Sequence, residues 1–199
     1  MARSEVAFLA LLAAVGLGRL VEMRLSRRHQ RALAAQGARR EPEPGFAAMV
    51  ALHTGVLVAS AVEVVALRRP FLPAVAVPAL IAFALANALR WWVIATLGTH
   101  WNVQVVGSLS LGVVTGGPYR FVRHPNYVAV FVELLALPLV HGAWLTAVAG
   151  AALHVPVLRR RLALEEAVLG ADATYRAAMS GKPRFVPRLR ARGSAWPTS

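Results

Sequence analysis

Gly117-Pro118-Tyr119-Arg120-Phe121-Val122-Arg123-His124-Pro125-Asn126-Tyr127 is a polar segment that directly precedes a long apolar run. A second polar segment, Arg161-Leu162-Ala163-Leu164-Glu165-Glu166, follows another apolar run. Both segments are dense in side chains that carry charge or form hydrogen bonds. Polar groups placed beside apolar runs indicate a chemical site at the edge of a membrane.

The composition indicates an integral membrane protein. The chain has 199 residues and is 57% hydrophobic, with a mean hydropathy of +0.55, and several apolar runs approach the ~20 residues that cross a bilayer. It carries 22 Lys and Arg against 9 Asp and Glu. The arginines cluster at the ends of apolar runs, where membrane proteins place cytoplasmic charge, so we expect no nucleic-acid partner. The chain has no cysteine and no histidine pair at metal-binding spacing, so we expect no metal site.

The apolar runs predict an all-α integral membrane protein with about five transmembrane helices. Three spans precede the polar loop and two follow it, at about 5–25, 46–67, 71–97, 127–139 and 143–158. The link at His141-Gly142 is so short that the last two spans must form an antiparallel helical hairpin.

The segments between the spans are polar or rich in glycine and proline. We expect a loop over 26–45, a re-entrant or interfacial loop over 98–123 that could include short extended segments, and a polar helix over 159–179. Most basic residues fall on the side of the polar loop, and only Arg3, Arg68 and Arg69 fall on the other. The positive-inside rule then predicts a multi-pass plasma (inner) membrane protein with its N-terminus outside and its site and C-terminus in the cytoplasm.

Ionisable residues inside predicted spans are candidates for function. Arg19 and Glu22 lie three residues apart on one helical face, so we expect them to pair with each other. His53 and Glu63 are ten residues apart and share a broad helical face at different depths. They are either packing residues or contacts for a ligand inside the membrane.

The residues alone leave the chemistry open. The chain has no Gly-x-Gly-x-x-Gly fingerprint and no serine nucleophile elbow. The His124-Pro125-Asn126-Tyr127 turn at a helix start could bring an imidazole, backbone N–H groups and a phenol to one polar small molecule. Arg161 and Glu165 lie four residues apart, which fits either a cooperating acid and base or a plain surface ion pair.

Taken together, these motifs resemble the isoprenylcysteine carboxyl methyltransferase family of integral-membrane enzymes that use S-adenosylmethionine. The resemblance covers roughly residues 98–190 and rests on 117–127, Arg161, Glu165-Glu166, Tyr175 and Arg184-Phe185-Val186-Pro187. More weakly, Arg19 to Glu22 with His53 and Glu63 resemble a bacterial branch. Members of that branch often accompany type III polyketide synthases and methylate alkylresorcinol or alkylpyrone lipids.

The resemblance implies a single membrane methyltransferase domain over 1–199. The three N-terminal spans would lie in 1–97, and the catalytic loop, hairpin and C-terminal helix in 98–190. Residues 124–127 would hold the methionine and ribose parts of S-adenosylmethionine, while Glu165 would bind the cofactor and act in catalysis. Further cofactor contacts are implied for the adenine wall and a glutamine: Gln104, Leu111, Gly112, Val113, Val114 and Tyr119. Arg161 would be catalytic and face the methyl acceptor, with His53 and Glu63 also expected there.

We therefore expect an O-methyltransferase that acts on a lipophilic, membrane-resident acceptor such as an alkylresorcinol or alkylpyrone. The alternatives are a prenylcysteine carboxyl methyltransferase and, from another class, a non-catalytic membrane binding or transport protein that uses the intramembrane charges. A carboxylate acceptor is already ionised at neutral pH, whereas a phenol with a pKa near ~10 would benefit from a base. Glu165 and Glu63 are the candidate bases. The sequence leaves the oligomeric state unknown.

Overall fold

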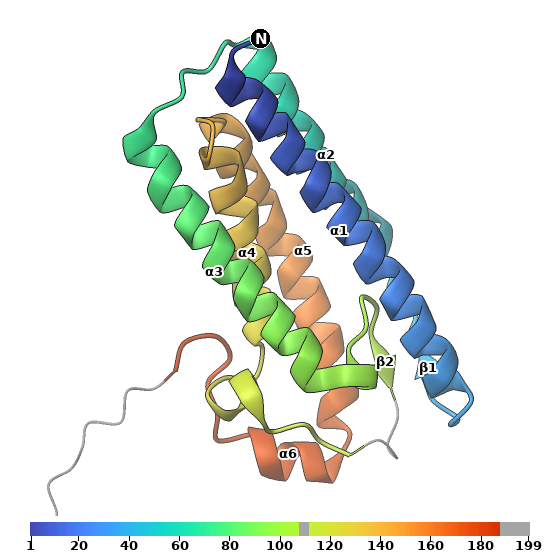
Figure 1. Ribbon diagram of the computed structural model, residues 1–199. Helices are drawn as coiled ribbons and strands as arrows, with labels where there is room; N and C mark the ends of the chain where they lie inside the picture. The colour runs from blue at the N-terminus through green and yellow to red at the C-terminus, as the bar shows by residue number, and fades with distance from the viewer. Residues whose placement is uncertain (108–111, 188–199) are drawn as a thin grey trace, which may run out of the picture.

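The computed structural model describes residues 1–107 and 112–187 and is predominantly helical (Figure 1). The α-helices in these ranges are α1 (Arg3–Ala34), α2 (Phe46–Ala66), α3 (Pro73–Leu97), α4 (Pro125–Leu139), α5 (Trp144–Gly170) and α6 (Ala173–Met179). Two short 3-10 helices, η1 (Gly98–His100) and η2 (Gly117–Arg120), flank the central loop. Strands β1 (Arg39–Arg40) and β2 (Val106–Gly107) pair antiparallel, with Arg39 opposite Gly107.

Helices α1 to α5 form an elongated bundle whose two ends carry different elements (Figure 1). The N-terminus lies at one end, whereas α6, the two strands and the loop that joins α3 to α4 gather at the other. A hydrophobic core that includes Phe8, Val64, Phe83, Leu137 and Ala143 fills the N-terminal end. The polar loop is therefore held at one end of an apolar bundle, as the sequence predicts.

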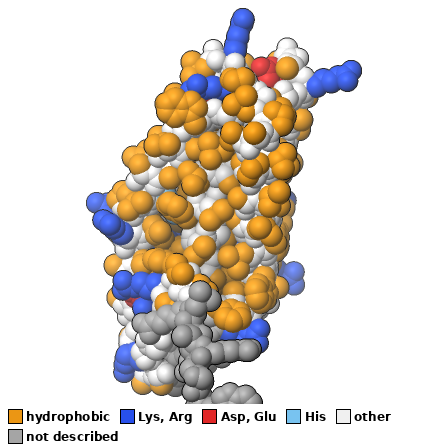
Figure 2. Space-filling view, turned by 90° about the vertical axis from the view of Figure 1, so that its left-hand side faces the viewer, with side chains coloured by type: hydrophobic (Ala, Val, Ile, Leu, Met, Phe, Trp, Pro, Cys, Tyr) orange, Lys and Arg blue, Asp and Glu red, His pale blue; other side chains and the backbone are white. Residues whose placement is uncertain are grey.

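Among the described residues, three helices are long and apolar enough to cross a membrane: Arg3–Ala34, Phe46–Ala66 and Pro73–His100. Helix α4 is a shorter apolar helix. Large hydrophobic side chains point outward from the bundle, and Leu85 is 66% exposed and Leu153 60% exposed. Figure 2 shows hydrophobic side chains over much of one face, with Lys and Arg projecting at the top and around the lower part. The chain is an all-α membrane protein, and the count of five spans and their orientation stay predictions.

Helix α1 is longer than predicted, because it continues to Ala34 rather than ending near Leu25. The expected loop over 26–45 therefore begins as helix. No glycine or proline interrupts residues 26–34, and Leu33 is buried. The extra turns also hold the loop that follows α3, since the Ser26 hydroxyl accepts a hydrogen bond from the Val103 N–H at 2.9 Å. Gly37, with φ of 82°, follows the end of the helix.

The polar helix predicted over 159–179 is not a separate element. Its first part continues α5, which runs unbroken from Trp144 to Gly170, and its second part is the short helix α6. The break falls at Asp172, whose carboxylate caps α6 by accepting a hydrogen bond from the Thr174 N–H at 2.8 Å. The polar end of α5 therefore carries Arg161 and Glu165 on a rigid continuation of the hairpin.

The predicted antiparallel hairpin of α4 and α5 is confirmed, with residues 140–143 as the link. Glu63 of α2 lies at its turn. The Glu63 carboxylate accepts hydrogen bonds from the N–H and the hydroxyl of Thr146, each at 2.7 Å, and pairs with Arg69 at 2.9 Å. A carboxylate at a helix N-terminus satisfies otherwise unpaired N–H groups and interacts well with the helix dipole.

A buried ion network joins α1, α3 and α4. The predicted pair of Arg19 with Glu22 is confirmed at 2.7 Å. Arg90 also pairs with Glu22 at 2.5 Å, and Arg19 pairs with Glu133 at 2.8 Å. The two cations and two carboxylates balance, which makes their burial in an apolar bundle tolerable.

Gly150 of α5 packs closely against Val56 of α2. A Cβ atom at position 150 would lie 2.8 Å from Cγ2 of Val56, so either the Val56 side chain or the helix backbone would have to shift. We expect Gly150→Ala to lower the free energy of unfolding by about 1–3 kcal/mol. Gly55→Ala is the control, because nothing lies within 4 Å of its Cβ position and alanine favours a helix by ~1 kcal/mol. Thermal unfolding in detergent should separate the two variants, and equal midpoints would contradict this packing.

Candidate active site

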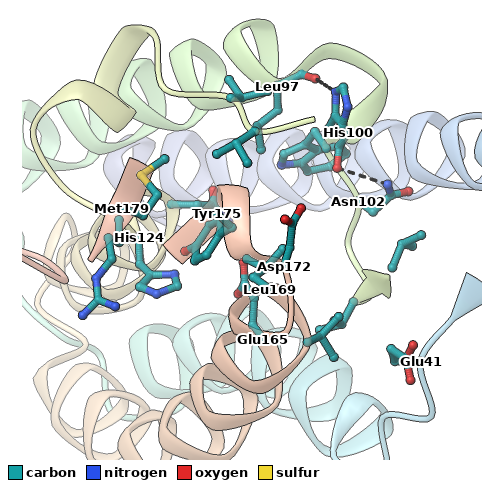
Figure 3. Close-up of a pocket in the computed structure, with 18 of the residues that line it drawn as sticks. Glu41, Leu97, His100, Asn102, His124, Glu165, Leu169, Asp172, Tyr175 and Met179 are labelled. Atoms are coloured by element: carbon teal, nitrogen blue, oxygen red, sulfur yellow. Dashed lines mark hydrogen bonds between the residues drawn. The ribbon is translucent and has the colours of Figure 1, made fainter. Parts of the chain in front are cut away.

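A cavity of about 720 Å³ lies at the polar end of the bundle. Its walls come from the end of α3, the loop after it, the 117–127 segment, the polar end of α5, and α6. Figure 3 shows Glu165, Asp172, His124 and Tyr175 around this space, with Asn102 beyond them. The cavity volume is within the usual range for small-molecule sites.

The 117–127 segment is shaped by glycine and proline. Gly117 has φ of +52°, and a Cβ there would come within 2.9 Å of the Thr96 methyl carbon, so only glycine fits. His124 precedes α4 as its N-cap residue, and Pro125 occupies the first helical position, where its missing N–H costs nothing. The turn thereby directs His124, Asn126 and Tyr127 toward the cavity.

Arg161 and Glu165 do not form a surface ion pair. The Tyr127 hydroxyl lies between them and forms a hydrogen bond with each. The Tyr127 hydroxyl donates a hydrogen bond to the Glu165 carboxylate and accepts one from Nε of Arg161 at 3.1 Å. Arg161 also donates from Nη1 to Glu43 at 2.6 Å and from Nη2 to the Val103 carbonyl at 2.6 Å. Arg161 is therefore held by residues from three separate chain segments.

Glu166 faces away from this arrangement and holds His124. Its carboxylate pairs with Nε2 of His124 at 3.2 Å, with Arg123 at 3.3 Å and with Arg184 at 2.6 Å. Glu166 lies in the polar end of α5, outside the apolar spans. Hydrogen bonds from Arg184 hold the pKa of Glu166 below its usual value against the effect of partial burial, and the bond to His124 acts in the same direction.

The segment after α6 folds back on the loop. The Arg123 N–H donates to the Pro183 carbonyl and the His124 N–H to the Arg184 carbonyl, each at 2.9 Å. The Lys182 ammonium donates to the Tyr119 carbonyl at 2.7 Å. The segment that carries the Arg184–Pro187 motif noted in the sequence thus holds the loop that contains Tyr119, Arg123 and His124.

The structure brings most of the predicted site residues to one place. The cavity is lined by Gln104, Gly112, Val113, Val114, Tyr119, His124, Asn126, Tyr127, Arg161 and Glu165. Pro125 is buried beside it at the start of α4. Leu111 lies outside the described residues. His53 and Glu63 are not brought together, because Glu63 caps the hairpin ~15 Å along α2 from His53.

Several lining residues were not predicted from the sequence. Glu41, Trp101, Asn102 and Asp172 line the cavity, and Glu43 pairs with Arg161 behind it. In the sequence, the Glu41-Pro42-Glu43-Pro44 run predicts only a loop, because alternating prolines break a helix. It does not indicate that Glu41 or Glu43 belongs to a site. Its role depends on a contact with a residue 118 positions away.

A second cavity, of about 590 Å³, lies inside the bundle and is lined by residues of α1 to α5. Its walls are mainly aliphatic, but the buried ion network of Arg19, Glu22, Arg90 and Glu133 also lines it, and so does His53. The two cavities share the residues Trp101, Asn102, Asn126, Tyr127 and Arg161. A polar chamber and an apolar chamber therefore meet at Tyr127 and Arg161.

The polar cavity presents unpaired hydrogen-bond acceptors and aromatic walls to a small polar ligand. The side-chain oxygens of Asn102 and Asn126 are buried with no hydrogen-bond partner among residues 1–107 and 112–187. Such atoms are rare in proteins unless a ligand or water meets them. Burial raises the pKa of Tyr119, and raises that of Tyr175 to about 12, so both remain neutral aromatic walls.

Comparison with known proteins gives an independent indication. Residues 79–171 match the model of the isoprenylcysteine carboxyl methyltransferase (ICMT) family. The chain is also similar to the uncharacterized protein YpbQ of Bacillus subtilis (strain 168). The two are 26% identical over 163 residues, which cover 81% of this chain and 96% of that protein. With the apolar helices, the match supports a membrane methyltransferase of the isoprenylcysteine carboxyl methyltransferase family.

Proposed function

We propose that the protein is an S-adenosylmethionine-dependent O-methyltransferase that acts on a lipophilic acceptor such as an alkylresorcinol or alkylpyrone. The observation that carries the proposal is the meeting of the two cavities at Tyr127 and Arg161. A polar cofactor and an apolar acceptor would each have a chamber of matching chemistry. Their reacting atoms would meet at the shared wall, which is the alignment that a displacement reaction needs.

The polar chamber offers partners for several parts of the cofactor. Among the residues that the structure describes, the side-chain oxygens of Asn102 and Asn126 have no partner, so they can accept hydrogen bonds from N–H or hydroxyl groups of the ligand. Glu165 and Asp172 supply negative charge to a cationic ligand, and Tyr119 supplies an aromatic wall. When bound, S-adenosylmethionine supplies a methyl group on a positively charged sulfur.

Arg161 is placed to orient the acceptor oxygen. Its guanidinium lies in the wall between the chambers and remains positively charged at all physiological pH values. It could hold a carboxylate or polarise a phenol, and a cation beside a phenol lowers its pKa. Because Glu43, Val103 and Tyr127 already hold its nitrogens, Arg161 needs little reorganisation to act.

A phenolic acceptor must also lose a proton. In the proposed role, the Glu165 carboxylate takes this proton, either directly or through the Tyr127 hydroxyl, which already donates to Glu165. Glu63, the other candidate base, is engaged by Thr146 and Arg69 at the opposite end of the hairpin. We therefore assign the proton to Glu165.

The test is methyl transfer by the purified protein from labelled S-adenosylmethionine to alkylresorcinol and alkylpyrone lipids. A base-stable labelled product is expected, whereas a base-labile ester on a prenylcysteine would indicate the carboxyl methyltransferase instead. Absence of cofactor binding in calorimetry would contradict the proposal and favour a binding or transport role.

Glu165→Gln should weaken the binding of S-adenosylmethionine. Because a carboxylate that faces a cationic ligand is worth roughly 1.5–3 kcal/mol, the Kd should rise about 10- to 100-fold. Glu5→Gln is the matched control, since Glu5 lies at the far end of the bundle and only caps α1. Isothermal titration calorimetry measures the Kd of both variants for S-adenosylmethionine. Equal Kd values would show that Glu165 does not bind the cofactor.

A further inference from the structure

His53 of α2 and His154 of α5 lie side by side in the wall of the apolar cavity. Their ring centroids are 5.5 Å apart and the rings are nearly perpendicular, at 88°. His154 is only 3% exposed. The sequence showed these histidines as isolated residues 101 positions apart, and only the packing of α2 against α5 brings them together.

The pair offers hydrogen bonds that the protein leaves unused. Within the described part of the chain, neither ring nitrogen of His154 has a hydrogen-bond partner. Nδ1 of His53 bonds to the Met49 carbonyl at 2.7 Å, so it must carry the proton, and a neutral ring then presents Nε2 as an acceptor. A neutral imidazole at His154 adds one donor and one acceptor.

The position of the pair is fixed relative to Arg161. His154 precedes Arg161 by seven residues, so it lies on the same face of α5, ~10 Å along the axis toward the apolar half. On α2, His53 lies four residues, or ~6 Å, beyond Met49, whose sulfur lies 3.4 Å from Nη1 of Arg161. Along the helix axes, the backbone positions of His154 and His53 therefore lie about 6–10 Å from those of Arg161 and Met49, toward the apolar half. Both histidines line the same cavity as Arg161.

A purely hydrocarbon ligand would leave this pair unsatisfied. The nearby cavity wall is aliphatic, with Val56, Val130 and Leu134 packed together. Burying a polar group without a partner costs roughly 1–3 kcal/mol. A hydroxyl on the ligand would donate to Nε2 of His53 and accept from His154, which removes that cost.

We propose that His53 and His154 bind a second polar group of the acceptor, a hydroxyl that lies on the membrane side of the methylated oxygen. The inference rests on the proposed function and narrows its substrate class to amphiphiles with two polar groups at their head. The histidines thus determine specificity, and an acceptor with only hydrocarbon beyond the methylated group is disfavoured.

The experiment uses pentadecylresorcinol and meta-pentadecylphenol, which differ by a single hydroxyl. Wild-type protein should prefer the resorcinol by about 10- to 100-fold in kcat/KM, as expected when one buried polar contact is lost. His154→Leu should reduce this preference to about threefold or less, and His154→Gln should restore part of it because the amide keeps a donor and an acceptor. Val157→Ala, which alters the same cavity without removing a polar group, should keep the preference.

Binding is measured separately, by competition of either lipid against tritiated pentadecylresorcinol in a scintillation proximity assay without cofactor. Equal affinity of wild-type protein for the two lipids, or a preference that survives His154→Leu, would overturn the inference. Tighter binding of the resorcinol with no methyl transfer would support the histidine site while refuting the proposed function. The two proposals can therefore fail independently.

Discussion

Arg161→Ala is expected to lower the rate of methyl transfer by about 10²- to 10³-fold, the usual effect of removing one preorganised donor from a reacting oxygen. The Kd for S-adenosylmethionine should stay within about threefold, because the residues proposed to hold the cofactor remain. Single-turnover methyl transfer and calorimetric titration measure the two effects separately. A large loss of cofactor affinity would show that Arg161 binds the cofactor rather than the acceptor.

A control is needed because Arg161 also supports the fold. Its removal leaves the Glu43 carboxylate, whose side chain is 5% exposed, without its partner at 2.6 Å. The free energy of unfolding should therefore fall, and Glu43→Gln added to Arg161→Ala should recover part of it. The double variant should remain inactive. If the double variant recovered activity, the role of Arg161 would be to neutralise the buried Glu43 carboxylate and not to orient the acceptor.

Arg161→Lys gives a second comparison at the same position. Lysine keeps the charge but cannot reach Tyr127, Glu43 and the Val103 carbonyl at once, because these three contacts use the planar guanidinium fork. We expect an intermediate rate. A rate equal to that of wild-type protein would show that charge alone suffices.

The sequence predicted those parts of the site that depend on local order. The 117–127 segment and the α4–α5 hairpin follow from glycine, proline and a short link, and each is determined within a few residues of chain. Arg161 and Glu165 lie on one helical face by spacing alone. Their joining through Tyr127 could not be derived, because it depends on how α4 packs against α5.

Long-range partners explain most of what the sequence missed. Glu43 meets Arg161, His53 meets His154, and the 182–184 segment binds the loop, in each case across many residues of chain. Helix ends were also misplaced, because residues 26–34 are good helix formers whose polar side chains look like a loop until Ser26 is seen to hold Val103. Hydropathy identifies the membrane spans, but it does not show which faces of the helices pack against one another.

Arg90→Met is expected to lower the free energy of unfolding by about 3–5 kcal/mol, because it leaves an uncompensated charge inside the bundle. Glu22 and Glu133 would then share Arg19 alone, and both carboxylates are nearly buried. In an apolar environment, no cation then compensates the free-energy cost of desolvating the second carboxylate. Unfolding in detergent, followed by circular dichroism, measures the change.

The double variant Glu22→Leu with Arg90→Met should be more stable than Arg90→Met alone. It removes one cation and one carboxylate together and leaves Arg19 paired with Glu133 at 2.8 Å, so the remaining charges balance. Neutral pairs replaced by apolar side chains of similar size are often tolerated, whereas single removals are not. If the double variant lost as much stability as the sum of the two single variants, charge balance would not be what holds these helices together, and the packing of the side chains would have to account for the loss.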